Sequence, residues 1–411
     1  MGNKRGKAVW VFMAVIALTG LGIGLSENVL ANYYKEVYDA SAFQRGFLEF
    51  PREIPGVICI FIVSLLSFIG DIRLSIVAQV LCVAGLTTLG LVTPSFGVML
   101  IFLFMFSLGQ HLFMPLSDSL GMSLAEKGSF GSMLGRLNGV RTAFTMVAGI
   151  IVFVGFKSGS FSFDTPVKSI FLIAAGVFAV TFGLLVYMQR LIGKEKKRRT
   201  FTLVFRKEYA IFYLLSALFG ARKQIMLVYG PWVLIDLMGF GADTMGLLAI
   251  AGAAVGIPLV PAVGRWIDRY GTARVMAIEA AAFFFIYIAY GVLSAGLSTG
   301  WVQAVGLAVV LAFAINMADR LTMQFGMVRA VYMRSIAIAP EDVTPTLSTG
   351  MALDHVLSIG SAVLCGQLWQ QLGPQYVFVF AALLSVGNMI VALRIRKETK
   401  TDHSNKGNVA S

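Results

Sequence analysis

Apolar residues fill most of the chain in long blocks, and short polar segments separate these blocks. A membrane-spanning helix needs about 20 apolar residues to cross roughly 30 Å of hydrocarbon. Blocks of this length predict twelve spans, at about residues 8–31, 45–68, 73–92, 97–121, 136–157, 167–189, 208–235, 244–264, 275–294, 302–326, 346–369 and 374–394. The pattern therefore predicts an all-α membrane protein.

The longest basic stretch, Lys194–Arg199, lies between the sixth and seventh spans and divides them into two equal sets. Two equal sets of spans are typical of transporters with an internal duplication. We expect an N-terminal six-helix bundle at 1–189, a basic cytoplasmic linker at 190–207, a C-terminal six-helix bundle at 208–396 and a polar, disordered cytoplasmic tail at 397–411.

Composition supports the membrane assignment. Only 13% of the 411 residues are charged and 57% are hydrophobic, whereas about 25% of the residues of a soluble domain are charged. The first apolar run begins near Ala8 and is too long for the core of a cleaved signal peptide. We therefore expect it to stay in the protein as the first span.

The net charge of +12 could indicate nucleic-acid binding, but its distribution indicates orientation. With the N-terminus placed in the cytoplasm, most of the 33 Lys and Arg residues lie in cytoplasmic segments, and those in the opposite loops are Lys35, Arg45, Lys157 and Lys168. This bias follows the positive-inside rule. It predicts a multi-pass protein of the cell inner membrane with both termini in the cytoplasm, surrounded by lipid and without a nucleic-acid partner. We expect a monomer.

Enzyme chemistry has little support in the sequence. The cysteines, Cys59, Cys82 and Cys365, all lie in apolar runs without metal-binding spacing, and the histidines are far apart. No nucleophile–base set and no phosphate-binding loop occurs. We expect no metal, no cofactor and no direct use of ATP.

The connection after the eighth span reads Gly264-Arg265-Trp266-Ile267-Asp268-Arg269-Tyr270-Gly271-Thr272-Ala273-Arg274. It resembles the signature loop G-x-x-x-D-R-x-G-x-x-[RK] of the major facilitator superfamily. The resemblance implies two six-helix bundles related by a pseudo-two-fold axis, and transport by alternating access. It also implies a latch at the cytoplasmic gate, formed by Gly264, Asp268, Arg269 and Gly271, in which Asp268 can cap a helix start. The corresponding loop of the first half keeps Asp71 and Arg73.

Charged residues inside spans are costly, at roughly 2.5–3.5 kcal/mol on insertion scales, and they are therefore paired, hydrated or functional. Glu49, Arg52 and Glu53 share one face at the start of the second span, and Glu27 lies at a comparable depth in the first. Three acids with one base predict a proton-coupling site. Alternatively, Glu49 lies at the headgroup level and Arg52 and Glu53 join two helices.

The seventh span carries Arg222 and Lys223 near its midpoint, with Tyr229 two turns from Arg222 on the same face. These residues predict a binding site for an anionic or zwitterionic group, to which Arg52 and His111 are further candidates. Alternatively, the cations neutralise acids of neighbouring spans. For His111, a hydrogen-bonded core histidine is the competing interpretation.

Further charged residues share a depth near the cytoplasmic ends of four spans. Asp118 and Arg141 form one expected gate pair, and Arg320 and Asp354 form another, with Asp319 and His355 beside them. Asp354 is an additional candidate for proton coupling.

The function predicted from these features is proton-coupled secondary transport of a small organic, anionic or zwitterionic solute. Efflux of amphipathic drugs and flipping of a lipid-linked head group are alternatives, although the fifth span lacks the G-x-x-x-G-P-x-x-G-G motif of drug/proton antiporters. A membrane sensor or scaffold without transport activity is the alternative of another class.

Overall fold

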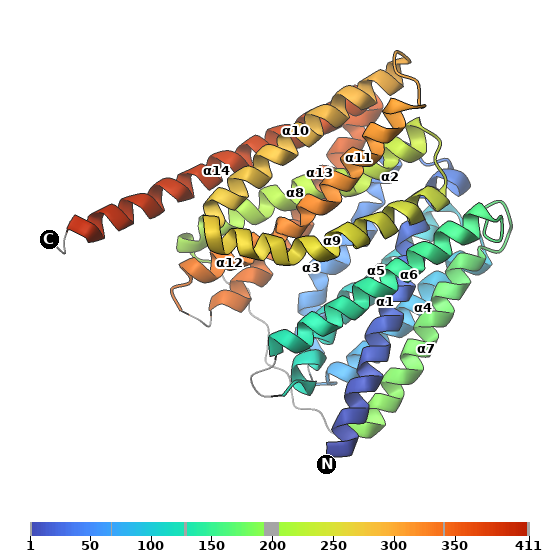
Figure 1. Cartoon of the computed structure of the whole chain (residues 1–411). Coiled ribbons are helices and arrows are strands. Elements are labelled where there is room, and N and C mark those ends of the chain that lie inside the picture. Colours follow the sequence, from blue (N-terminus) through green and yellow to red (C-terminus); the bar gives the residue numbers. More distant parts are fainter. Residues whose placement is uncertain (1, 67, 127–129, 193–204, 340–341, 409–411) are drawn as a thin grey trace. The chain divides into compact units, whose positions relative to one another are not determined.

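The computed structural model describes residues 2–66, 68–126, 130–192, 205–339 and 342–408, and every regular element in these ranges is a helix (Figure 1). The chain divides into two compact units. Unit 1 comprises Met1–Ser41, Leu48–Phe201 and Phe240–Ala253, and unit 2 comprises Ala42–Phe47, Thr202–Gly239 and Ala254–Ser411. The predicted basic stretch Lys194–Arg199 lies outside the described residues.

Unit 1 is a bundle of long helices with an apolar core. Its helices are α1 (Gly2–Tyr38), α3 (Glu49–Leu65), α4 (Asp71–Leu91), α5 (Phe96–Leu124), α6 (Phe130–Lys157), α7 (Ser169–Ile192) and the first part of α9 (Ala242–Tyr270). Phe12, Ile72 and Leu116 are completely buried in the core. The core therefore joins α1, α4 and α5, which are far apart in the sequence.

Unit 2 contains the remaining helices. They are α2 (Ala42–Phe47), η1 (Lys207–Tyr209), α8 (Ala210–Trp232), the π-helical turn η2 (Val233–Leu237), the rest of α9, α10 (Thr272–Thr299), α11 (Leu307–Thr322), η3 (Met323–Gly326), α12 (Met327–Ile336), α13 (Val343–Gln371) and α14 (Pro374–Asn408). Tyr209, Val263 and Val328 are completely buried in its core.

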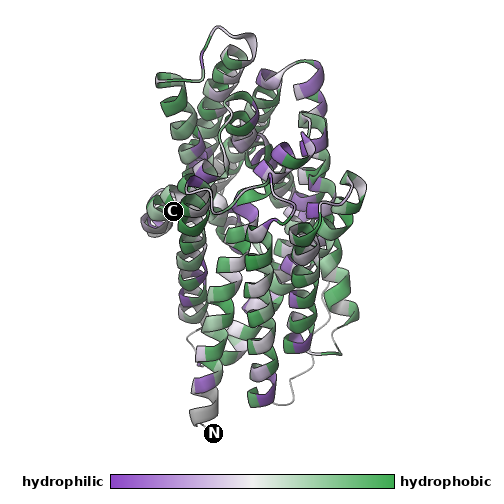
Figure 2. Ribbon diagram, turned by 90° about the vertical axis from the view of Figure 1, so that its right-hand side faces the viewer, coloured by the Kyte–Doolittle hydropathy of each residue, from purple (hydrophilic) through white to green (hydrophobic). Residues whose placement is uncertain are grey.

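Each predicted span overlaps a helix, and the all-helical membrane fold is confirmed, but the count of twelve is not. Nine helices of the described part are long and apolar enough to cross a membrane. Helices α3, α9 and α11 fall short of that standard, and charged residues such as Arg52 and Asp319 occur in them. Many large apolar side chains are exposed, for example Trp10 (71%) and Phe285 (69%), and hydrophobic residues occur along the whole length of the long helices (Figure 2). Such surfaces suit a lipid environment.

Two short segments pack in the unit that does not contain their chain neighbours. Helix α2 packs against α8 and α13 of unit 2, and Gly46 permits this approach because a Cβ atom there would collide with the Ala362 carbonyl oxygen. The first part of α9 belongs to unit 1, where a Cβ atom on Gly246 would lie 2.8 Å from the Gly149 carbonyl oxygen. Small residues at both places let the backbones approach closely.

The end of the chain differs from the expectation. Helix α14 continues to Asn408, whereas the sequence predicts a disordered tail from residue 397. No glycine or proline occurs between Asn388 and Lys406, so no helix-breaking residue ends the helix at the edge of the apolar run.

Candidate functional site

One arginine of unit 1 joins two carboxylates. The Arg52 guanidinium donates to Glu49 Oε1 at 2.7 Å through Nη1 and to Glu27 Oε2 at 2.5 Å through Nη2. Helix α3 can begin here because Pro51 is tolerated in a first turn and because Glu49 is favourable at the positive helix end. The fork of the guanidinium suits two carboxylates at once. The structure thus brings together three of the four residues of the predicted proton-coupling cluster, and Glu53 interacts electrostatically with Arg52.

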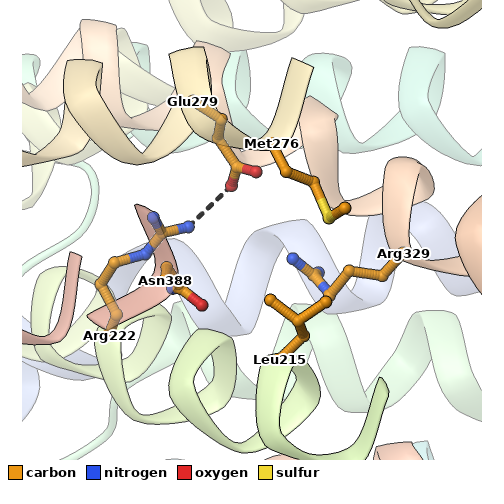
Figure 3. Close-up of a pocket in the computed structure, with 6 residues that line it drawn as sticks. All are labelled: Leu215, Arg222, Met276, Glu279, Arg329 and Asn388. Atoms are coloured by element: carbon orange, nitrogen blue, oxygen red, sulfur yellow. Dashed lines mark hydrogen bonds and ion pairs between the residues drawn. The ribbon is translucent and has the colours of Figure 1, made fainter. Parts of the chain in front are cut away.

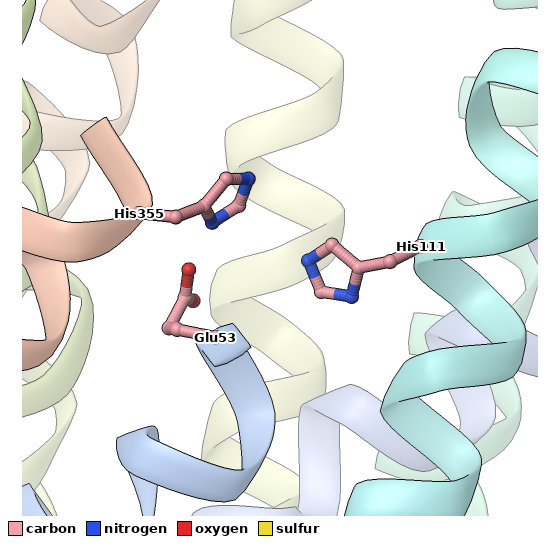
Figure 4. A group of neighbouring side chains, drawn as sticks. All are labelled: Glu53, His111 and His355. Carbon is pink, nitrogen blue, oxygen red and sulfur yellow. The ribbon is translucent and has the colours of Figure 1, made fainter. Parts of the chain in front are cut away.

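Neutral polar groups of α5 complete this cluster. The Gln110 side-chain amide donates to Glu27 Oε1 at 3.3 Å, and the Ser107 hydroxyl donates to the Arg52 carbonyl oxygen at 2.5 Å. His111 Nδ1 lies 2.9 Å from the Ser107 carbonyl oxygen, a contact that fixes the proton of the neutral ring on Nδ1. Ligand atoms of His111 and Glu53 lie within 4.8 Å of each other (Figure 4). We interpret His111 as part of this hydrogen-bonded cluster.

The predicted cation of α8, Arg222, is buried in unit 2 and pairs with an acid of α10. Its side chain is 1% exposed, and Nη2 donates to Glu279 Oε1 at 2.7 Å (Figure 3). The guanidinium also lies over the Phe283 ring, 3.6 Å from its centroid. This arrangement agrees with the alternative in which the cations of the seventh span neutralise acids of neighbouring spans.

Lys223 forms a second ion pair, with α13. Its Nζ atom lies 2.7 Å from Asp354 Oδ1, which also accepts a bond from the Ser358 hydroxyl at 3.2 Å. Gly220 makes the pair possible, because a Cβ atom there would lie 2.7 Å from the Asp354 Cα atom. The glycine therefore provides room for a helix, and the side chains of the pair remain 18% and 19% exposed.

Three more charged residues surround these pairs. Asp319 of α11 is buried and interacts electrostatically with Arg222 and Arg320. Arg329 of α12 lies over the Phe219 ring at 3.1 Å from its centroid and interacts with Glu279 and Asp354. Of the two expected gate pairs, Asp354 forms its ion pair with Lys223 in place of Arg320. Arg141 donates to Ser117 Oγ at 3.1 Å and interacts electrostatically with Asp118.

Tyr229 does not share a site with Arg222. Its hydroxyl donates to the Ala362 carbonyl oxygen at 2.6 Å, and its ring stacks on Trp369. The hydroxyl also lies 3.5 Å from the Ala42 carbonyl oxygen of α2. The side chain therefore holds α2, α8 and α13 together, which is a structural role.

The signature loop does not form a capped helix start. Helix α9 continues through Asp268 and Arg269, both exposed, and Gly264 lies within it. The corner is made at Gly271, which precedes α10 with φ of 78°.

The corresponding corner of unit 1 is Gly70, with φ of 95° before α4. Only glycine adopts such angles readily. Asp71 follows this glycine as Thr272 follows Gly271, so Thr272 and not Asp268 occupies the position equivalent to Asp71 at the corner. The Ser119 hydroxyl donates to Asp71 Oδ2 at 2.5 Å.

Sequence reasoning missed Glu279 and Arg329. Glu279 is the acid in an otherwise apolar run from Val275 to Tyr290, and an isolated acid in a span is expected to have a basic partner. That signal was available. Arg329 lies beyond the expected end of the tenth span, and no sequence pattern indicates that α12 turns it toward α8.

Comparisons with known proteins agree with the helical architecture. A family model described as Major Facilitator Superfamily matches residues 11–353. No curated protein matches the chain. Among solved structures, a mutant of the nucleoside transporter NupG aligns with a TM-score of 0.75 at 14% identity, covering 94% of this chain and 99% of that chain.

Two other solved transporters share the fold. A POT family transporter in complex with 5-aminolevulinic acid gives a TM-score of 0.72 at 13% identity, covering 95% of each chain. A D-xylose–proton symporter gives 0.65 at 12% identity, covering 94% of this chain and 95% of that chain. At these identities the likeness concerns the fold. The family points to transport and not to enzymatic catalysis. Since the family model spans most of the chain, this multi-pass membrane protein belongs to the major facilitator superfamily.

Proposed function

We propose that this protein is a secondary active transporter that moves a small organic solute by alternating access and is driven by protons. The observation that carries the proposal is the sharing of Arg52 between Glu27 and Glu49 in unit 1. Membership of a family of transporters supports the general activity.

The shared arginine makes Glu27 a suitable proton carrier. When Glu27 is ionised, Arg52 and Gln110 stabilise it. When Glu27 takes up a proton, the Arg52–Glu49 pair at 2.7 Å still balances the guanidinium. The 29% exposure of the Glu27 side chain gives the proton access to water, whereas Glu49 is 1% exposed. Glu27 can therefore change charge without leaving an unpaired buried ion.

The solute of this proposal carries an anionic or zwitterionic group. Arg222 and Lys223 lie within one turn of α8, and each pairs with a carboxylate from another helix. A solute carboxylate can replace Glu279 or Asp354 as the partner of these cations, and the displaced acid can take up a proton. Such an exchange links anion binding to proton binding without leaving a buried cation unpaired.

The proposal includes the orientation and the surroundings of the protein. The bias of Lys and Arg toward one set of loops supports cytoplasmic termini in an inner membrane. The exposed apolar side chains support contact with lipid. We propose that one chain is sufficient for transport.

The proposal is tested by transport into proteoliposomes with and without an imposed proton gradient. We expect the gradient to drive accumulation of the solute by wild-type protein, and we expect Glu27→Gln to equilibrate the solute without accumulating it. Glu208→Gln, which changes an exposed acid of η1, is the matched control and should accumulate solute normally. Gradient-driven accumulation by Glu27→Gln at the wild-type level would rule out Glu27 as the coupling residue.

A further inference from the structure

A small cavity lies inside unit 2 where α8, α10, α12 and α14 meet. Its volume is about 10 Å³, and it is lined by Leu215, Arg222, Met276, Glu279, Arg329 and Asn388 (Figure 3). A cavity of this volume has room for about one water molecule or one small ion. An organic solute does not fit in it, so its occupant differs from the whole solute of the proposed transport reaction.

The Arg222 side chain, which lines this cavity, has unused hydrogen-bond donors. Its Nη2 atom is bonded to Glu279, but Nε and Nη1 are buried and have no hydrogen-bond partner within the part of the chain that the structure describes. A guanidinium presents five N–H donors and cannot become neutral in a protein. Buried donors without an acceptor are costly. The Phe283 ring beneath the guanidinium stabilises its charge, but a ring face does not replace an acceptor in the guanidinium plane.

Arg329 brings a second positive charge to the same cavity. Figure 3 shows its guanidinium extending toward the Arg222–Glu279 pair from another helix. No described carboxylate lies within ion-pair distance of Arg329, and its neighbour is the Phe219 ring, 3.1 Å from the guanidinium carbon. Glu279 therefore borders two arginines but forms an ion pair with one of them. Arg222 is buried and Arg329 is partly buried, and two such neighbouring cations repel each other unless an anion lies between them.

Charge counting around the cavity leaves one cation in excess. The mutually interacting charged side chains in this region of unit 2 are Arg222, Lys223, Arg320, Arg329, Glu279, Asp319 and Asp354. Glu279 pairs with Arg222 and Asp354 with Lys223. Asp319 interacts electrostatically with Arg222 and Arg320, so four cations face three acids among the described residues and Arg329 is the one without a carboxylate. One monovalent anion would balance the set.

We propose that the cavity binds a small monovalent anion between Arg222 and Arg329. The anion accepts hydrogen bonds from the unused donors of Arg222 and pairs with Arg329. It also contacts the Asn388 side chain, which is a neutral partner. The flexible thioether of Met276 lets the wall adjust to an ion slightly larger than water. Two sources share this chemistry. One is a free halide such as chloride, and the other is the carboxylate of a solute, which rests on the proposed function and requires the cavity to open.

Anion-dependent stability of the full-length protein in detergent tests the proposal. The thermal unfolding midpoint is measured in sodium gluconate, whose anion is too large for the cavity, as chloride or formate replaces gluconate at constant ionic strength. We expect chloride to raise the midpoint saturably in wild-type protein. Arg329→Gln should weaken the apparent affinity at least about tenfold, which corresponds to about 1.4 kcal/mol. Arg334→Gln, an exposed arginine on the same helix, is the matched control and should respond as wild type does.

Line broadening of the chloride-35 resonance by wild-type protein is a second measurement that needs no variant. If formate reverses the broadening of the chloride-35 resonance, the halide and the carboxylate bind at the same site. Stabilisation by formate without broadening of the chloride signal assigns the site to a solute carboxylate. If neither anion has an effect, or if Arg329→Gln responds fully, the proposal is wrong and the cavity holds water. The proposed transport function fails separately, because these measurements use neither a proton gradient nor Glu27.

Discussion

The buried charges of the two units are arranged in opposite ways. In unit 1, one guanidinium pairs with two carboxylates, and one of these, Glu27, is partly exposed. In unit 2, Arg222 and Lys223 each have a separate carboxylate, and Arg329 is an additional cation. The first arrangement suits a group that gains and loses a proton. The second suits a group that binds an anion.

This difference shows that two sets of helices with a similar plan need not have similar chemistry. Both units contain a first-turn glycine corner, at Gly70 and Gly271, with nearly the same backbone angles. Their charged side chains follow no such correspondence, because Glu279 on α10 has its partner on α8, whereas Glu27 on α1 has its partner on α3. The backbone repeat therefore gives no guide to the function of an individual residue.

The largest effect is expected from Glu279→Gln. Arg222 is 1% exposed and would lose its ion-pair partner, and breaking one side of a buried pair costs about 3–5 kcal/mol. We expect a strongly lowered thermal unfolding midpoint in detergent. The double substitution Arg222→Met with Glu279→Leu should recover most of the loss, since apolar residues of similar volume can replace a buried pair. A single variant as stable as wild type would show that Arg222 has another counterion.

Arg52→Gln should have an intermediate effect. Glu27 and Glu49 would lose their shared cation, and hydrogen bonds to charged groups contribute about 1.5–3 kcal/mol. We expect a lowered thermal unfolding midpoint, but by less than for Glu279→Gln, because the Glu27 side chain is 29% exposed. Unfolding midpoints measured with exposed Arg136→Gln as the control check this. A midpoint equal to that of wild type would show that the two carboxylates do not depend on Arg52.

Asp354→Asn is expected to cost less than either of these changes. The Lys223–Asp354 pair is about one-fifth exposed, so solvent can stabilise the free ammonium. The free energy of unfolding should therefore fall by about 1 kcal/mol. The asparagine oxygen can still accept the bond from Ser358, 3.2 Å away. A loss of stability as large as that of Glu279→Gln would mean that Lys223 is effectively buried. Comparison of the thermal unfolding midpoints of the two variants tests this directly.

The sequence predicts the helices much better than the pairing within the site. Runs of apolar residues such as 73–92 and 167–189 predict helices α4 and α7 closely, because a span depends on local composition. The partner of a buried charge depends on which helix faces it. Asp354 was expected to pair with Arg320, but Gly220 brings α8 close to α13 and so makes Lys223 its partner. A close approach at one glycine is a tertiary feature that periodicity cannot reveal.

The smallest effect on stability is expected from Asp268→Asn, which tests the latch. Asp268 is exposed on the last turns of α9, and the turn itself depends on Gly271. An exposed substitution of this kind should change stability by no more than about 0.5 kcal/mol.

If the carboxylate acts in the gate, transport into proteoliposomes should nevertheless slow by about tenfold, equivalent to about 1.4 kcal/mol in the rate-limiting barrier. Asp164→Asn, an exposed acid in the connection between α6 and α7, is the control and should transport normally. Wild-type rates for Asp268→Asn at equal protein content would make this carboxylate dispensable and leave Gly271 as the residue that shapes the corner.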